Sequence, residues 1–237
     1  MSDRTQHTFS CLIFALFLGV LGAGSGCISA SAQPAEQLDE VDGHQTVVVV
    51  HGMGRTGLSM YWMASDLEER GYEVVNWSYS SYCCSVAELG AQLADELEAL
   101  EGPRPDRLHF VGHSLGGIII RWVLTHRPPP EDGRVVMLAT PNQGSAMADQ
   151  WADWGSWLLE PLDELTSDET STVQNLDPIE DRDVATIAGD DDSKVSPSEA
   201  RLAGEADHAV VPSEHTFIMN RDDVQQLVTT FLQNGRF

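Results

Sequence analysis

The sequence has very few positive charges. Of its 237 residues only 13 are lysine or arginine, against 37 aspartate or glutamate, so the formal net charge is −24, and Lys194 is the single lysine. An acidic surface repels the phosphate backbone of nucleic acids and anionic membranes, and we expect no nucleic-acid partner. The acidity is compatible with a protein kept soluble in high salt, where screening relieves self-repulsion, and equally with an ordinary acidic soluble protein.

Cysteine is also scarce. Of the four cysteines, Cys11 and Cys27 belong to the N-terminal region, which leaves the adjacent pair Cys83-Cys84. Neighbouring cysteines close only a small ring and do little to staple a fold, and no Cys-x-x-Cys spacing of a metal site occurs. We therefore expect a buried or simply oxidised pair rather than a redox centre, and neither a metal nor a cofactor.

Long apolar runs are absent except near the N-terminus. Phe9 to Leu21 is too short to cross a membrane comfortably as a mature helix, follows Arg4, and precedes the small residues Ala30-Ser31-Ala32. Residues 1–32 are predicted to be a secretory signal peptide, which places the protein outside the cell or in the periplasm or cell envelope. Cleavage after the last of these alanines is favoured over the alternative, a lipid anchor at Cys27.

The remaining chain predicts one domain. Residues 33–44 are polar and aperiodic and are expected to form a flexible tether, and residues 45–237 alternate short apolar runs with segments of helical spacing. Strands are expected at Thr46–Val50, Glu73–Tyr79, Leu108–Val111, Val135–Ala139, Val184–Ala188 and Ala209–Val211, and helices at Leu58–Arg70, Val86–Leu100, Gly117–Leu124 and Asp222–Leu232. This alternation predicts an α/β fold with a mainly parallel sheet of about six strands and helices on both faces.

One long interval interrupts the alternation. The insertion, at about 145–182, contains Trp151, Trp154 and Trp157 at three-residue spacing. An insertion of this length usually has a function, and we expect a small apolar cap or lid that lines the substrate pocket. The alternative is a cap whose tryptophans are core and which does not move.

The motif Gly-x-Ser-x-Gly marks the candidate nucleophile. Gly112 to Gly116 lie between an apolar strand and a helix, and Ser114 is the central residue. The two glycines leave room for a tight strand-to-helix turn that presents the serine hydroxyl, whereas a chance match would be an ordinary glycine-rich turn. The sequence therefore predicts a nucleophile elbow.

A nucleophilic serine needs a histidine base and an orienting acid. His215 follows the last strand and is preferred to His208, which precedes that strand and should lie at its opposite end. The acid is expected among Asp190, Asp191 and Asp192, after the fifth strand, because open parallel sheets gather functional groups at the carboxyl ends of strands. Asp207 is the less favoured competitor.

Two backbone N–H groups are the expected oxyanion donors. One belongs to Leu115, in the first turn of the helix after the serine, and the other to Met53, after His51-Gly52. We expect His51 and His113 to hold these loops by hydrogen bonds rather than to catalyse.

Together these segments resemble a bacterial lipase or esterase of the α/β-hydrolase superfamily. The resemblance rests on His-Gly-Met-Gly (51–54), Val-Gly-His-Ser-Leu-Gly-Gly (111–117), Thr-Pro-Asn-Gln-Gly-Ser (140–145), Asp-Ser-Lys-Val (192–195) and a late His-Thr-Phe (215–217). It implies a compact α/β-hydrolase without the first two strands of the full sheet, and it selects Asp192 as the acid. Many such lipases bind calcium through an aspartate two residues after the histidine, where Phe217 stands here, so calcium dependence is not expected.

The resemblance implies a secreted serine carboxylic-ester hydrolase that forms an acyl-enzyme. The cap and the acidic surface favour neutral lipid or acyl esters, with transient contact with lipid surfaces. An acyltransferase, amidase, thioesterase or phospholipase would use the same residues, because the superfamily alone does not specify the substrate. A non-catalytic module that binds an apolar ligand through the cap is the third alternative.

Overall fold

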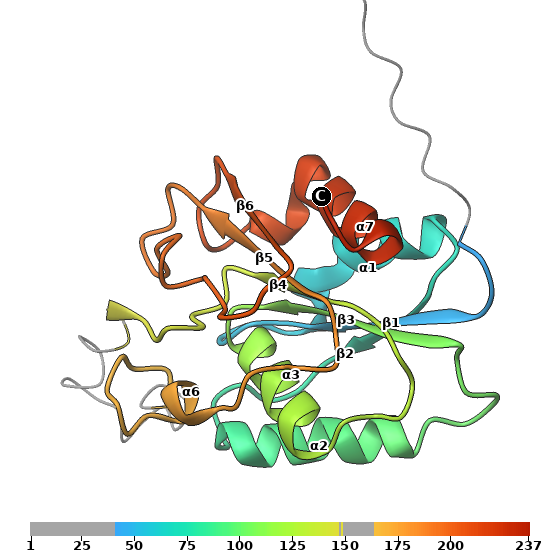
Figure 1. Ribbon diagram of the computed structural model, residues 1–237, viewed down its shortest axis with the longest axis horizontal. Coiled ribbons are helices and arrows are strands. Elements are labelled where there is room, and N and C mark those ends of the chain that lie inside the picture. The colour runs from blue at the N-terminus through green and yellow to red at the C-terminus, as the bar shows by residue number, and fades with distance from the viewer. Residues whose placement is uncertain (1–40, 147, 149–163) are drawn as a thin grey trace, which may run out of the picture. The chain divides into compact units, whose positions relative to one another are not determined.

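A single sheet of parallel strands organises the computed structural model, which describes residues 41–146, 148 and 164–237. Its strands are β1 (Gln45–Val50), β2 (Glu73–Trp77), β3 (Arg107–His113), β4 (Val135–Leu138), β5 (Val184–Gly189) and β6 (Asp207–Val211). They lie in the order β2-β1-β3-β4-β5-β6, and every neighbouring pair is parallel (Figure 1). The predicted six-stranded parallel α/β fold is confirmed.

Helices cover both faces of the sheet (Figure 1). The helices α2 (Val86–Glu98) and α3 (Leu115–His126) pack on one face, and α1 (Tyr61–Glu69) and α7 (Asp222–Asn234) pack on the other. Three short helices, η1 (Gly57–Met60), α6 (Thr172–Asn175) and η3 (Ile218–Asn220), lie in the connections.

The continuous β-branched run of β1 follows from this two-sided burial. Successive side chains of a strand point to opposite faces. Val48 and Val50 join the hydrophobic cluster beneath α2 and α3, whereas Val47 and Val49 join the cluster beneath α1 and α7, and all four are fully buried. A strand that is covered on both faces therefore has apolar residues at successive positions, instead of an alternation of apolar and polar residues.

The helix expected at Leu58–Arg70 differs from the prediction at its start. A 3-10 turn, η1, precedes α1, and the residues that pack against the sheet are Met60, Met63 and Leu67. Leu58, Tyr61 and Trp62 are 54–82% exposed. The methionine stripe lies on the side that meets the sheet, so it takes the core positions.

The parallel topology gathers the functional loops. The carboxyl ends of β1, β3, β4, β5 and β6 are followed by the residues singled out from the sequence, at 51–54, 114, 140–145, 190–192 and 215. Because neighbouring strands are parallel, these loops lie along one edge of the sheet.

Candidate active site

Ser114 occupies a strained turn between β3 and α3. Its backbone angles are φ 53° and ψ −123°, a region that side-chain-bearing residues rarely adopt. A Cβ at Gly116 would lie 2.3 Å from the Val50 carbonyl oxygen, and one at Gly112 would lie 2.7 Å from Gly117 Cα. The turn therefore requires glycine on both sides of the serine.

The structure brings Ser114, His215 and Asp192 into one chain of hydrogen bonds. His215 Nε2 lies 3.1 Å from Ser114 Oγ, and His215 Nδ1 lies 2.8 Å from Asp192 Oδ2. The other carboxylate oxygen of Asp192 accepts the backbone N–H groups of Lys194 and Val195, at 2.7 and 2.9 Å. The carboxylate is completely buried and the imidazole nearly so, which fixes the geometry of the pair.

The competing candidates lie elsewhere. His208 Nδ1 lies 2.6 Å from Thr186 Oγ1, at the opposite end of β6 from His215. Asp207 accepts the Phe237 N–H there. Asp190 and Asp191 are exposed. None of these side chains takes part in the hydrogen bonds around Ser114.

His113 links the turn of Ser114 to the loop of His215. Its Nε2–H donates to the His215 carbonyl oxygen at 2.9 Å, while its Nδ1 has no hydrogen-bond partner in the described part of the chain. Complete burial is the main cause that lowers the pKa of His113 well below its usual 6.5, and the nearby His215 lowers it further. This ring is therefore neutral. Its hydrogen bond holds the loop of His215 next to the turn of Ser114.

The loop after β1 packs directly against the nucleophile. A Cβ at Gly52 would lie 2.8 Å from His113 Nδ1 and 3.0 Å from Ser114 Cβ. His51 holds this loop, because its Nδ1–H donates to the Gly52 carbonyl oxygen at 2.9 Å and its Nε2 accepts the Tyr79 N–H at 3.3 Å. Burial lowers the pKa of His51 and keeps it in this neutral tautomer.

The two expected oxyanion donors are the backbone N–H groups of Met53 and Leu115. Met53 lines the pocket over Ser114, and its N–H donates to no acceptor in the described residues. Leu115 is the first residue of α3, so its N–H has no acceptor within the helix. The N-terminal end of a helix also favours negative charge there.

A pocket of about 510 Å³ opens over Ser114 and His215. Its apolar lining includes Met53, Pro141, Ala148, Leu165 and Val195. The predicted pocket tryptophans, Trp151, Trp154 and Trp157, lie outside the described residues. The space available would accommodate an acyl chain beside the serine hydroxyl.

Hydrogen bonds from segment 140–146 hold the loop of Asp192 in place. The sequence did not indicate this role. Asn142 Nδ2 donates to the Ala200 carbonyl oxygen at 2.9 Å, the Gln143 N–H donates to Glu199 at 2.9 Å, and Ser145 Oγ donates to Lys194 at 2.6 Å. Nothing in the sequence places these segments side by side. Only the adjacency of β4 and β5 does so.

Buried Arg121 supports the same segment from below. Its guanidinium donates to the Asn142 carbonyl oxygen at 3.3 Å and to the Leu176 carbonyl oxygen at 3.2 Å, and burial lowers its pKa to about 10. It therefore connects α3, the loop after β4 and the end of the insertion. The sequence did not indicate the role of Arg121 either, because a single arginine in an apolar helix forms no pattern that predicts a function.

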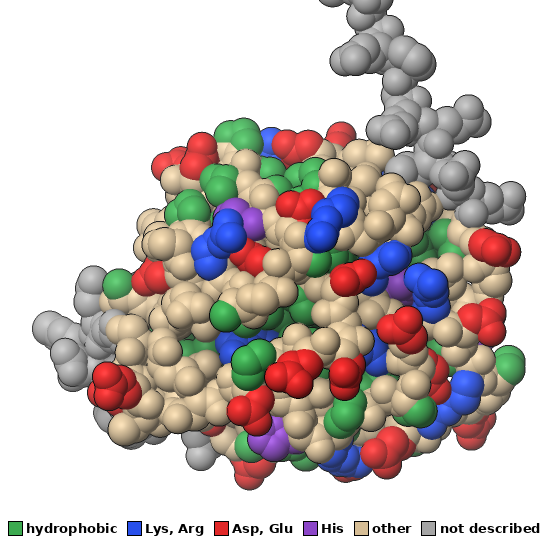
Figure 2. Space-filling view, in the orientation of Figure 1, with side chains coloured by type: hydrophobic (Ala, Val, Ile, Leu, Met, Phe, Trp, Pro, Cys, Tyr) green, Lys and Arg blue, Asp and Glu red, His purple; other side chains and the backbone are tan. Residues whose placement is uncertain are grey.

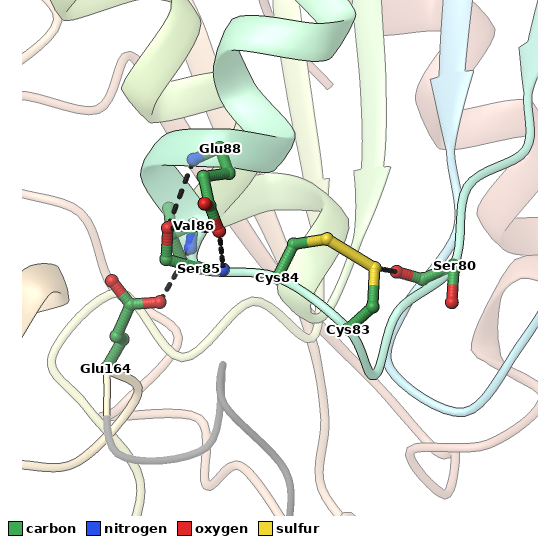
Figure 3. Close-up of a disulfide and its surroundings, with 7 residues drawn as sticks. All are labelled: Ser80, Cys83, Cys84, Ser85, Val86, Glu88 and Glu164. Atoms are coloured by element: carbon green, nitrogen blue, oxygen red, sulfur yellow. Dashed lines mark hydrogen bonds between the residues drawn. A yellow bond between two sulfur atoms is a disulfide. The ribbon is translucent and has the colours of Figure 1, made fainter.

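Cys83 and Cys84 form a disulfide directly before α2 (Figure 3). The preceding residues hold the loop after β1: Ser81 Oγ accepts the Gly54 N–H at 2.9 Å, and Tyr82 lines the pocket. The following residue, Ser85, caps α2 in a reciprocal capping box with Glu88. The disulfide therefore lies between Tyr82, which lines the pocket, and Ser85, which caps α2.

The described residues contain no group of three His, Cys, Asp or Glu side chains that could hold a metal ion. Phe217, at the position where similar lipases carry a calcium ligand, is 57% exposed. Within the same described segments, no helix is both long and apolar enough to cross a membrane.

A comparison with family models identifies residues 40–186 as a match to the family described as "Putative serine esterase (DUF676)". The chain belongs to this family. This family description agrees with the resemblance that the motifs predicted. No curated protein matches the sequence.

Solved structures show the same fold at low sequence identity. The propeptide form of the Bacillus licheniformis lipase BlEst2 superposes with a TM-score of 0.65 at 20% identity, over 84% of this chain and 52% of that one. A hydrolase from Pseudomonas aeruginosa PA01 gives 0.59 at 19%, over 82% and 92%. The phospholipase PlaB from Legionella pneumophila gives 0.58 at 16%, over 80% and 60%. This chain therefore spans about half the length of the first of these proteins.

Proposed function

We propose that the protein is a serine hydrolase that cleaves carboxylic esters of lipid or acyl type through an acyl-enzyme. The observation that carries this proposal is the unbroken chain of hydrogen bonds from Ser114 through His215 to Asp192, beneath an apolar pocket. Membership of a serine esterase family supports it.

In the proposed reaction, Ser114 Oγ attacks the ester carbonyl carbon while His215 Nε2 takes the hydroxyl proton. Asp192 stabilises the imidazolium that forms, and the N–H groups of Met53 and Leu115 stabilise the oxyanion. The imidazolium then protonates the departing alcohol. Water, activated by the same imidazole, releases the acid and restores the serine.

The same residues would serve an acyltransferase, amidase, thioesterase or phospholipase. A series of acyl esters of increasing chain length, with matched amides, thioesters and phospholipids, separates these activities by the ratio of their kcat/KM values. A purely ligand-binding module is disfavoured, because such a module has no need of a complete hydrogen-bonded set of nucleophile, base and acid.

Two features support work outside the cytoplasm and at lipid surfaces. A disulfide between Cys83 and Cys84 is typical of an oxidising compartment, in accord with the proposed signal peptide at residues 1–32. The exposed apolar side chains of Leu58, Tyr61 and Trp62 would suit transient contact with a neutral lipid surface. Mass spectrometry of the mature N-terminus distinguishes cleavage after Ala32 from lipidation at Cys27.

The test of the catalytic proposal is Ser114→Ala. We expect loss of p-nitrophenyl ester hydrolysis by about 10³-fold or more, and loss of labelling by a fluorophosphonate probe, with an unchanged circular dichroism spectrum. Ser198→Ala, outside the pocket lining, is the matched control and should keep both properties. Unchanged turnover in the Ser114 variant would refute the proposal.

A further inference from the structure

Two of the few positive charges of the chain line the pocket over Ser114. They are Arg55, on the loop after β1, and Lys194, on the loop after β5, and both are half-buried. No aspartate or glutamate is among the described residues that line this pocket. Acidic side chains instead spread over the outer surface (Figure 2). The described lining of the pocket therefore carries positive charge, whereas the net charge of the chain is −24.

Neither cation is neutralised by a carboxylate of the described chain. Other arginines pair closely with acids, for example Arg70 with Asp66 and Arg127 with Asp95, both at 2.7 Å. Among the described residues, Arg55 donates only to the Thr216 carbonyl oxygen, at 3.3 Å, and its guanidinium carbon lies 5.6 Å from the centre of the Phe217 ring. The chain has 37 acidic residues, yet none of those in the described segments pairs with either pocket cation, and we infer that these charges serve a ligand.

Lys194 is held in place by hydrogen bonds of its backbone rather than of its side chain. Its N–H donates to Asp192 Oδ1 and its carbonyl oxygen accepts Ser145 Oγ–H, so the residue is anchored to the acid of the site. The ammonium group forms no ion pair within the described residues. Both Lys194 and Arg55 line the same pocket as His113, the residue beside the nucleophile.

We propose that the pocket selects esters that carry an anionic group, a carboxylate or a phosphate, and that Arg55 and Lys194 bind this group. The inference rests on the proposed ester hydrolysis and narrows its substrate class. A guanidinium and an ammonium are the side-chain groups that bind anionic oxygens best, and they do so more strongly when partly withdrawn from water. The acidic surface as a whole favours neutral esters, but a bound substrate contacts the pocket lining.

The test compares two esters that differ only in charge. The first is the mono-p-nitrophenyl ester of suberic acid, with a free terminal carboxylate, and the second is its methyl ester. We expect wild-type kcat/KM to favour the anionic ester, and Lys194→Met to lower the ratio of the two values about fivefold. Arg55→Met should act in the same direction, and Lys194→Arg should restore most of the preference.

Arg127→Met is the matched control. It removes an equal charge from the far end of α3, where Arg127 pairs with Asp95 and Glu98, so the ratio should stay at the wild-type value. A second pair of substrates, a monoacylglycerol phosphate and the corresponding monoacylglycerol, tests a charge on the alcohol side. A preference in the first pair indicates an anionic acyl group, and one in the second indicates a phosphorylated alcohol.

The failure of this inference differs from failure of the proposed function. Turnover of charged and neutral esters with equal kcat/KM in both pairs, unaffected by Lys194→Met and Arg55→Met, would overturn the anion selectivity and leave the esterase intact. Absence of turnover on every ester, together with no fluorophosphonate labelling of Ser114, would refute the proposed function itself.

Discussion

The ring of His113 donates a hydrogen bond to the backbone carbonyl oxygen of His215, 2.9 Å away. The residue that precedes the candidate nucleophile therefore positions the backbone of the candidate base. Nucleophile and base come from strands that are three places apart in the sheet, β3 and β6, and this bond ties their loops together. The side chain of His215 in turn lies 3.1 Å from Ser114 Oγ.

Loss of this bond should impair the reaction step. His113→Phe keeps a ring of similar size but removes the N–H donor, and we expect kcat to fall about tenfold while KM changes little. The pH profile of kcat should also shift, because the imidazole of His215 is no longer held in one environment. His126→Phe, at the exposed end of α3, is the control. Unchanged kcat in a folded His113 variant would contradict the positioning role.

Asp192→Asn should be severely impaired. The amide can still accept the Lys194 and Val195 N–H groups, but its NH₂ favours the His215 tautomer that carries its proton on Nε2. That tautomer cannot accept the serine proton, so kcat should fall about 10³- to 10⁴-fold near neutral pH. Asp191→Asn, one residue away and exposed, should keep full activity. Equal activity of the two variants would exclude Asp192 as the orienting acid.

Acid should destabilise the fold through its buried histidines. His109 is fully buried between the Gln45 side chain and the Arg134 N–H, and burial, with the charge of Arg134 next, lowers its pKa to about 3. Below pH 6.5 the unfolded chain binds a proton that the folded chain does not, so stability falls with falling pH down to about pH 3. This one residue contributes a slope of at most about 1.4 kcal/mol per pH unit.

Urea unfolding at several pH values measures this slope. His109→Gln should reduce the dependence on pH by the contribution of one histidine, about 2 kcal/mol between pH 6.5 and pH 5. His126→Gln, which removes an exposed histidine, should leave the dependence as it is. An identical slope in wild type and the His109 variant would show that this histidine is protonated in the folded protein.

Removal of the disulfide should affect activity more than stability. Adjacent cysteines close a ring too small to constrain the unfolded chain much, so Cys83→Ser with Cys84→Ser should change the free energy of unfolding by less than about 1 kcal/mol. The same segment holds Gly54 through Ser81 Oγ, and kcat should fall about threefold as that loop loosens. Treatment of wild type with a reductant should reproduce the change. A large loss of stability with unchanged kcat would contradict this account.

The sequence predicts the architecture well because parallel topology follows from local patterns. The valine run of β1 and the strand-turn-helix context of Ser114 identify their elements without reference to the rest of the chain. Once the strands are parallel, their carboxyl ends lie along one edge of the sheet. His215 is then distinguished from His208 because it follows the carboxyl end of the last strand, whereas His208 lies at the start of that strand. The structure places both histidines as this reasoning expects.

Features that depend on the detailed path of the loops could not be predicted. Three consecutive aspartates follow β5, and only the backbone of that loop turns Asp192 inward, so the residues alone left the choice open until the resemblance selected it. The buried face of α1 does not follow from its apolar residues alone, because Tyr61 and Trp62 are exposed whereas Met60 and Met63 are buried. The contacts of Asn142 and Arg121 join segments that are far apart in the chain, and no sequence pattern indicates that these segments lie next to each other.

The fastening of segment 140–146 to segment 194–201 couples the root of the insertion to the orienting carboxylate. Ser145, at the beginning of the insertion, bonds to Lys194, two residues beyond Asp192. A chimera that takes its insertion from another enzyme should therefore keep these bonds by starting the graft after residue 145. A junction further upstream would remove the bond between Ser145 and Lys194, beside the orienting carboxylate.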